Sequence, residues 1–162
     1  MEGVVSPQGS MDKGHEPWGK LVLDQSGRVS DRLALVDHSV DVAACFRELC
    51  RIPSVAPALD FAAGRQLRDM DIDRLSVLAL LHDVGKCNHG FQAKADPSAR
   101  RVAGHVRELA PLFDDADLAQ RLAEVVDLEA TSQWFDRAEG FTQMMLASVS
   151  HHGTQLPLRL YH

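Results

Sequence analysis

Two adjacent pairs of metal-ligand side chains stand out in the sequence. His82-Asp83 ends an apolar run and precedes Val84-Gly85-Lys86, and His151-His152 is followed by Gly153. Imidazole and carboxylate groups are common ligands of divalent transition metals, and neighbouring residues at a chain turn can project in different directions. With two separate histidines added, the chain offers five candidate imidazoles besides Asp83: His38, His82, His105, His151 and His152. This set is large enough for two metal ions.

A histidine taken alone is more often an ordinary core or surface residue than a ligand. A buried imidazole needs a partner, however, and several inward-facing histidines around one aspartate are hard to satisfy without a metal. Imidazole-rich ligation favours Mn, Fe, Co, Ni or Zn over Mg, which prefers oxygen ligands. His15, His89 and His162 fall in expected loops or at the terminus, and we expect them to be ordinary surface residues.

Length and composition bound the class of protein. The 162 residues, 45% of them hydrophobic, fit one domain with a buried core. No apolar stretch approaches the roughly 18 to 20 residues of a membrane span, and the N-terminus has no secretory signal pattern. The three cysteines are odd in number and form no Cys-x-x-Cys motif, which favours reduced thiols. We expect a soluble cytoplasmic protein with no membrane partner.

The charge pattern bears on the kind of partner. A formal net charge of −6 argues against a surface that coats nucleic acid indiscriminately. It does not exclude a nuclease, because bound divalent cations reverse the sign of the potential where a phosphate must lie. Residues 114–129 are acidic, whereas basic residues lie near the expected site: Lys86, Lys94, Arg100, Arg101 and Arg107. The simpler interpretation of both runs is that they are solvated helix faces.

The elements that position these residues are expected to be helices, since no alternating strand pattern of useful length is present. Residues 1–17 are expected to be a disordered leader, in which Gly9-Ser10-Met11 looks tag-derived. After a turn at residues 24–27, Ser30 or Asp31 is predicted to cap the first helix. His38 would then lie in the middle of that helix, on its apolar stripe, and point inward.

The remaining pattern predicts further helices and an all-α fold. A second helix is expected over residues 56–67. A third is expected from Asp71 or Asp73 to His82, ended by Gly85 in the left-handed conformation. Residues 87–98 are predicted to form a loop and residues 101–109 a short helix that carries His105. Two more helices are expected around Leu118 to Val126 and from Phe141 to His152.

Taken together, these residues resemble a known family. A separated His, then His-Asp, then a later Asp is the signature of the HD superfamily of metal-dependent phosphohydrolases. More closely, the chain resembles from Trp18 to Gly153 the HD nuclease domain of the CRISPR-associated nuclease-helicase of type I interference systems. Phe91-Gln92, eight residues after Asp83, and the His-His-Gly element narrow the likeness to that nuclease. The motifs are Trp18-Gly19-Lys20, His38-Ser39-Val40-Asp41-Val42-Ala43, Leu81-His82-Asp83-Val84-Gly85-Lys86, Phe91-Gln92, Gly104-His105 and His151-His152-Gly153.

The resemblance implies an HD-domain helical bundle over residues 18–162 that cuts single-stranded DNA opened by an RNA-guided surveillance complex, beside a helicase domain or subunit. By motif match, one ion would be held by His38, His82 and Asp83, and Asp83 would bridge to a second ion held by His105, His151 and His152. A carboxylate can span two ions about 3.5 to 4 Å apart.

Two further residues receive expected roles. Lys86 would sit beside the scissile phosphate and stabilise developing negative charge, unless it is a solvated lysine beyond the helix end. Asp41, three residues after His38, would orient that imidazole by a hydrogen bond or else face solvent.

The sequence also departs from the family pattern. The superfamily's final aspartate should follow the His-His-Gly element, yet residues 153–162 contain no Asp or Glu, and no Gly-rich Lys-Ser/Thr motif of a helicase is present. We therefore expect a bundle truncated at its C-terminus, either a shortened chain or a natural short form. The first ion would then be under-ligated, with impaired cleavage.

Two other classes of function remain open from the sequence. An HD phosphohydrolase of nucleotides or other small phosphate esters would have a closed pocket and would not act on DNA. A non-catalytic docking fragment would bind no transition metal.

Overall fold

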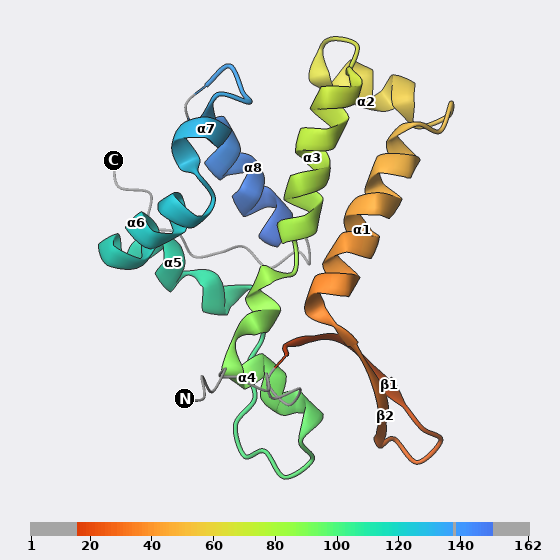
Figure 1. The fold of residues 1–162 in the computed structure, drawn as a ribbon, viewed down its shortest axis with the longest axis vertical. Coiled ribbons are helices and arrows are strands. Elements are labelled where there is room, and N and C mark those ends of the chain that lie inside the picture. Colours follow the sequence, from red (N-terminus) through yellow and green to blue (C-terminus); the bar gives the residue numbers. More distant parts are fainter. Residues whose placement is uncertain (1–15, 138, 151–162) are drawn as a thin grey trace, which may run out of the picture.

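The structure is a computed structural model that describes residues 16–137 and 139–150. A two-stranded antiparallel hairpin comes first, and all later elements are helical (Figure 1). The strands and the longer helices are β1 (Trp18–Leu23), β2 (Val29–Ala34), α1 (Leu35–Cys50), α2 (Ala56–Ala63), α3 (Asp69–Leu81), α6 (Ala116–Val125) and α8 (Gly140–Val149). The short helices are α4 (His89–Gln92), α5 (Pro111–Asp114) and α7 (Leu128–Ser132), and the 3₁₀ turns are η1 (Val84–Cys87), η2 (Ala93–Ala95) and η3 (Arg107–Leu109). The described part is mostly helical, as predicted.

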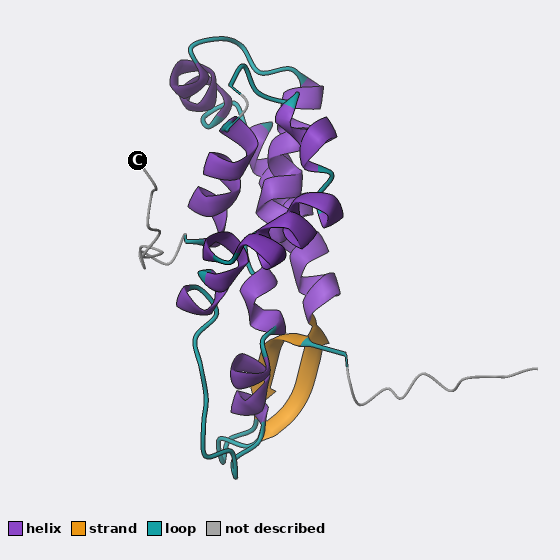
Figure 2. Ribbon diagram, turned by 90° about the vertical axis from the view of Figure 1, so that its left-hand side faces the viewer, coloured by secondary structure: helices purple, strands orange, loops and turns teal. Residues whose placement is uncertain are grey.

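Helix α3 is the centre of the fold. Helix α1 packs along one side of it and α8 along another, while the hairpin and α4 lie at one end (Figures 1 and 2). Leu78 of α3 meets Phe141 and Met145 of α8 in the buried core. Burial of each such side chain contributes about 1.5 to 3 kcal/mol relative to exposure. The C-terminal end of α3, where His82 and Asp83 follow, is therefore fixed by the core.

The hairpin corrects the expectation that the chain has no strands. β1 and β2 pair antiparallel, and the expected turn at residues 24–27 joins them. In this turn Asp24 Oδ1 accepts hydrogen bonds from Ser26 N at 2.8 Å and Arg28 N at 2.9 Å, and Gly27 has a φ of 78°. No residue of β2 is fully buried, and the middle of the strand is exposed on both faces, so it shows no alternation of apolar and polar residues that a sequence pattern could reveal.

Helix α1 begins later than predicted. Ser30 and Asp31 belong to β2 and cap nothing, and the helix starts at Leu35. His38 thus lies in the first turn of α1, not in its middle. Leu35, His38 and Ser39 share the buried side of that turn, which confirms that His38 points inward.

The bounds of the next two helices also differ. Helix α2 ends at Ala63, because Gly64 takes the left-handed conformation with a φ of 67°. Helix α3 begins at Asp69, and Asp71 is its third residue rather than its cap. The Asp71 carboxylate accepts a hydrogen bond from the backbone N of Arg68 at 2.9 Å, as in a capping box.

Gly85 does not end α3 in the left-handed conformation. The helix stops at Leu81, and the chain continues through His82 into the 3₁₀ turn η1. Among the described glycines, only Gly27 and Gly64 have positive φ. Gly85 is needed for a different reason: a Cβ at this position would lie 1.7 Å from the carbonyl oxygen of His105. A close approach of two backbone segments requires the glycine.

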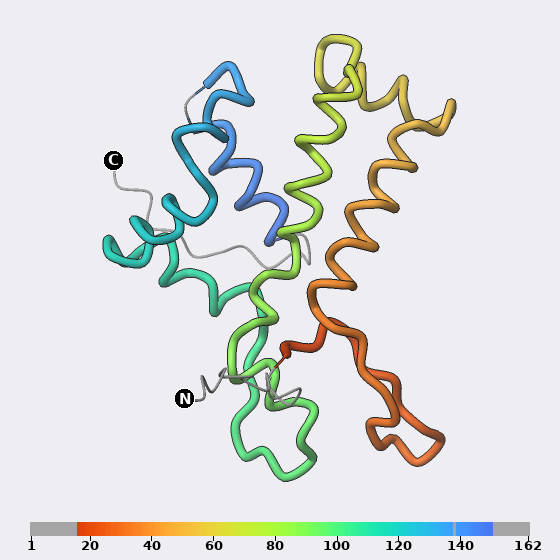
Figure 3. Tube along the Cα trace, in the orientation of Figure 1, coloured from red at the N-terminus to blue at the C-terminus, as the bar shows by residue number. Residues whose placement is uncertain are grey.

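The segment that carries His105 is not the predicted helix over residues 101–109. Residues 101–106 are irregular, and only η3 is helical there. Figure 3 traces this segment as a long loop that leaves α4 and returns beside η1. The backbone N–H and C=O groups of this segment form hydrogen bonds with side chains and with α4 rather than within a helix. One example is Ala103 N to Gly90 O at 3.0 Å. Residues 87–98, predicted as a loop, contain α4 and η2.

Other expectations agree with the structure. Helix α6 carries Leu118 and Leu122, and Asp115 caps it. Helix α8 spans Gly140–Val149, and its expected extension to His152 lies outside the described residues. Cys45, Cys50 and Cys87 are free thiols. None of the described helices is long and apolar enough to cross a bilayer.

Candidate metal centre

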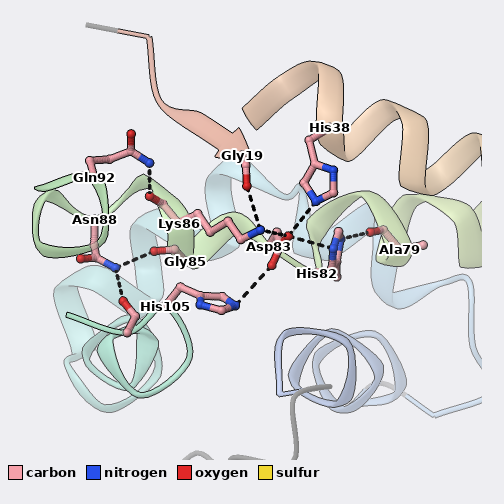
Figure 4. A network of polar contacts seen from close by, with 11 residues as sticks. Gly19, His38, Ala79, His82, Asp83, Gly85, Lys86, Asn88, Gln92 and His105 are labelled. Carbon is pink, nitrogen blue, oxygen red and sulfur yellow. Dashed lines mark hydrogen bonds and ion pairs between the residues drawn. The ribbon is translucent and has the colours of Figure 1, made fainter. Parts of the chain in front are cut away.

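The carboxylate of Asp83 is the centre of a buried cluster at the end of α3. Its side chain is only 3% exposed. The oxygen Oδ2 lies 3.0 Å from His38 Nε2 and 3.0 Å from His82 Nε2, and Lys86 Nζ contacts the same oxygen (Figure 4). One carboxylate oxygen is thus shared by two imidazoles and one ammonium.

The second oxygen of Asp83 faces a different histidine. His105 Nε2 lies 3.3 Å from Oδ1, without the geometry of a hydrogen bond. Oδ1 is buried and accepts no hydrogen bond from any described residue. An unsatisfied buried acceptor costs about 1 to 3 kcal/mol, and more when it is charged. A cation between Oδ1 and His105 would remove this cost.

The tautomer of His82 is set by the backbone of α3. His82 Nδ1 lies 2.7 Å from the carbonyl oxygen of Ala79, which can only accept, so Nδ1 carries a proton and donates it. A neutral ring then has its lone pair on Nε2, which faces Asp83 Oδ2. Two acceptors 3.0 Å apart repel each other unless a proton or a metal ion lies between them. Metal-binding histidines commonly donate their second ring nitrogen in this way.

His38 is held in place by the first residues of β1. A Cβ on Gly19 would lie 2.7 Å from His38 Cβ, so only glycine lets the strand pass this close. Burial lowers the pKa of His38 below its ordinary value, although the hydrogen bond to Asp83 opposes this shift. The neutral imidazole that results is the form that binds metals.

The charge state of Asp83 suits a ligand as well. Burial acts to raise the pKa of its carboxyl, but the hydrogen bonds from Lys86 and from His82, when that ring also carries a proton on Nε2, more than offset this effect and hold the pKa well below the usual range. Asp83 is therefore ionised at neutral pH. The donor atoms of His38, His82 and Asp83 all lie within 4.8 Å of one another. Two imidazole nitrogens and one carboxylate oxygen fit a divalent transition metal and leave coordination positions for water or phosphate.

Lys86 is fixed at this cluster by two oxygens. Its ammonium group donates to the carbonyl oxygen of Gly19 at 3.0 Å and pairs with Asp83 Oδ2. The side chain is only 12% exposed, so Lys86 is not a freely solvated lysine beyond the helix end. The Lys86 ammonium group contacts the same oxygen, Asp83 Oδ2, that a metal ion would bind. A bound ion and Lys86 would therefore share this oxygen.

The structure thus brings together four of the predicted ligands, His38, His82, Asp83 and His105, and it places Lys86, also predicted to lie at the site, beside them. Asp41 is exposed on α1, and no hydrogen bond joins it to His38 within the described part of the chain. His151 and His152 lie outside the described residues, so their expected ligand role stays a prediction.

Sequence reasoning assigned no role to two amides beside the cluster, Asn88 and Gln92. Gln92 Oε1 accepts from Trp18 N at 2.9 Å, and its Nε2 donates to Trp18 O at 3.0 Å and Lys86 O at 2.7 Å. This amide ties the start of β1 to η1. Phe91-Gln92 was already visible as a motif, but nothing in the sequence showed which distant backbone it bonds.

A helical bundle that gathers a separated histidine and a His-Asp pair around one buried carboxylate is typical of HD-type metal-dependent hydrolases. The family model described as Cas3, HD domain matches residues 18–160, and the chain belongs to this family. The predicted resemblance is confirmed, and membership implies a metal-dependent nuclease role in CRISPR systems. Comparisons with curated proteins and with solved structures found no match.

Proposed function

We propose that this chain is a two-metal nuclease domain that cleaves single-stranded DNA during CRISPR interference in the cytoplasm. The observation that carries the proposal is the division of Asp83 between two sets of imidazoles. His38 and His82 face one carboxylate oxygen, and His105 faces the other. This arrangement matches what a carboxylate that bridges two ions requires.

In this proposal His38, His82 and Asp83 hold the first ion. Asp83 and His105 hold the second, together with His151 and His152. The nitrogen-rich ligand set favours Mn, Fe, Co, Ni or Zn. Two such ions, when bound, supply the Lewis acidity that activates water and stabilises the leaving oxygen of a phosphodiester.

Lys86 contributes a positive charge beside the reacting phosphate. The carbonyl oxygen of Gly19 orients its ammonium group, and burial leaves little water around it. A fixed cation in such surroundings stabilises the negative charge that develops on the phosphate oxygens in the transition state.

A basic surface beside His105 supports a polyanionic substrate. Within residues 94–108 the exposed basic side chains are Lys94, Arg100, Arg101 and Arg107, and the acidic residues are Asp96 and Glu108. Lys94 Nζ lies 4.3 Å from the centre of the Phe91 ring, and that ring packs edge-on against His105. In a chain with a net charge of −6, this local excess favours a DNA backbone at the site. An RNA-guided surveillance complex and a helicase domain or subunit would present the single strand.

The proposal is tested by metal analysis and DNA cleavage on the same samples. The chain, loaded with Mn²⁺, is incubated with single-stranded DNA and, separately, with nucleotides. Asp83→Ala removes the bridge between the ions, so we expect loss of bound metal and of cleavage. Asp117→Ala, at an exposed position of α6, serves as the control.

Three results would contradict the proposal. Cleavage retained by Asp83→Ala would remove the bridge from the mechanism. Turnover of nucleotides without cleavage of DNA would favour a small-molecule phosphohydrolase. Absence of bound metal in the wild-type chain would favour a non-catalytic docking module.

A further inference from the structure

Asn88 connects the backbone beside Asp83 to the backbone beside His105. Its side-chain Nδ2 donates to the carbonyl oxygen of Gly85 at 2.7 Å and to that of Gly104 at 2.8 Å (Figure 4). Its Oδ1 accepts from Phe91 N at 2.8 Å and so caps α4. Gly85 follows Asp83 by two residues, and Gly104 immediately precedes His105. One amide therefore spans the two halves of the expected second metal site.

The segment around His105 depends on such contacts because it has no regular secondary structure. Residues 101–106 form neither a helix nor a strand, so no ladder of backbone hydrogen bonds fixes them. Apart from Asn88, the polar contacts of Ala103 and Gly104 are Ala103 N to Gly90 O at 3.0 Å and Gly104 N to Glu108 Oε1 at 2.7 Å. The Glu108 contact is made within the same segment. It cannot fix the distance to Asp83.

We propose that Asn88 is a positioning residue that holds His105 against Asp83 and thereby sets the affinity of the second metal ion. The part that concerns the ion rests on the function proposed above, whereas the position of His105 does not. Only an amide supplies two donors and one acceptor in this arrangement. An aspartate at this position would direct a carboxylate oxygen at two carbonyl oxygens, and the segment would move away.

Two variants separate this role from that of the helix cap. Asn88→Asp is nearly isosteric and keeps the acceptor for Phe91 N, but it loses both donors. Asn88→Ser also keeps a capping oxygen, and its side chain is too short to bridge Gly85 and Gly104. Gln120→Glu on α6 makes the same amide-to-acid change at an exposed position away from the site and serves as the control.

The first measurement needs no metal. In the metal-free protein, the ring protons of His105 and Phe91 should show a nuclear Overhauser effect, because the ring centroids lie 5.1 Å apart in an edge-on arrangement. We expect this signal to be lost in both Asn88 variants and kept in Gln120→Glu. The contact between the rings of His38 and His82, 5.7 Å apart, should persist in all four proteins.

The second measurement is equilibrium dialysis against Mn²⁺. We expect the second equivalent of Mn²⁺ to bind about tenfold more weakly in the Asn88 variants, with the first equivalent unchanged. The added charge of Asn88→Asp would by itself strengthen cation binding, so the expected change has the opposite sign to a simple charge effect.

The outcomes are distinguishable. If both Asn88 variants keep the wild-type contact between His105 and Phe91, Asn88 does not position His105. If the variants also lose the contact between His38 and His82, Asn88 has a general structural role and the positioning role is overturned as well. A wild-type chain that binds no second equivalent contradicts the two-metal function, while the ring contacts still decide whether Asn88 positions His105.

Discussion

Because Gly85 lies so close to the backbone of His105, a substitution of this glycine should displace His105 by an amount that the structure gives. In Gly85→Ala the new Cβ would lie 1.7 Å from the carbonyl oxygen of His105, and real Cβ contacts are essentially never shorter than 3.0 Å. The backbone at His105 must therefore retreat from η1 by about 1.3 Å or more. The imidazole would move with its backbone, so His105 Nε2, now 3.3 Å from Asp83 Oδ1, would lose its position for an ion that both groups bind. Overpacking of this kind costs about 1 to 3 kcal/mol of stability.

The assay is Mn²⁺ binding together with chemical unfolding. We expect Gly85→Ala to bind one equivalent of Mn²⁺ through His38, His82 and Asp83, and to lose most affinity for the second. Val84→Ala is the matched control, because the neighbouring side chain is 39% exposed and its removal leaves this contact intact. Two tightly bound equivalents in Gly85→Ala, with wild-type stability, would refute the reasoning.

Two further substitutions probe the core and the chemistry separately. Asp71→Asn should lower the free energy of unfolding by about 1 to 2 kcal/mol without changing metal content, because it removes the negative charge and one of the two oxygens that accept from the Arg65 and Arg68 guanidinium groups and from the Arg68 backbone N. Hydrogen bonds from Arg65 and then Arg68 hold the pKa of Asp71 well below its usual range. The difference in unfolding free energy between wild type and variant should therefore be full above about pH 4 and shrink as the pH falls further. Urea unfolding at several pH values measures this difference, and a value that does not change with pH would contradict the role given to the Asp71 carboxylate. In the proposed mechanism Lys86 acts on the phosphate and is not a metal ligand, so Lys86→Met should slow DNA cleavage by about a hundredfold without loss of bound metal. Dialysis and single-turnover cleavage measure the two effects, and loss of metal would show that Lys86 holds the site together.

The residues that could be predicted from the sequence belong to helices with one buried face. Leu75 and Leu78 recur at helical spacing, and the core forms where they lie. His82 and Asp83 follow the same helix, so their approach to the core could be predicted. The inward direction of His38 followed from the apolar stripe, even though the helix starts later than expected.

The parts that could not be predicted depend on contacts between distant segments. Gly85 looked like a helix terminator, because a sequence does not show that the backbone of His105 passes over it. The segment around His105 looked helical, but its backbone bonds to the side chains of Asn88 and Glu108 and to the carbonyl oxygen of Gly90. The strand β2 has two exposed faces and thus no periodic pattern. The expected ligands His151 and His152 lie outside the described residues.

The contacts that build the candidate metal centre join residues far apart along the chain. The hydrogen bond between His38 and Asp83 spans 45 residues, and those from Lys86 to Gly19 and from Gln92 to Trp18 span 67 and 74. Closing such long loops has an entropic cost that is compensated only when the surrounding fold forms. A nascent chain on the ribosome therefore cannot form the cluster around Asp83 until the segment with His105 has emerged and docked. The proposed hydrolysis would therefore be withheld from a half-synthesised protein by the order in which its parts become available.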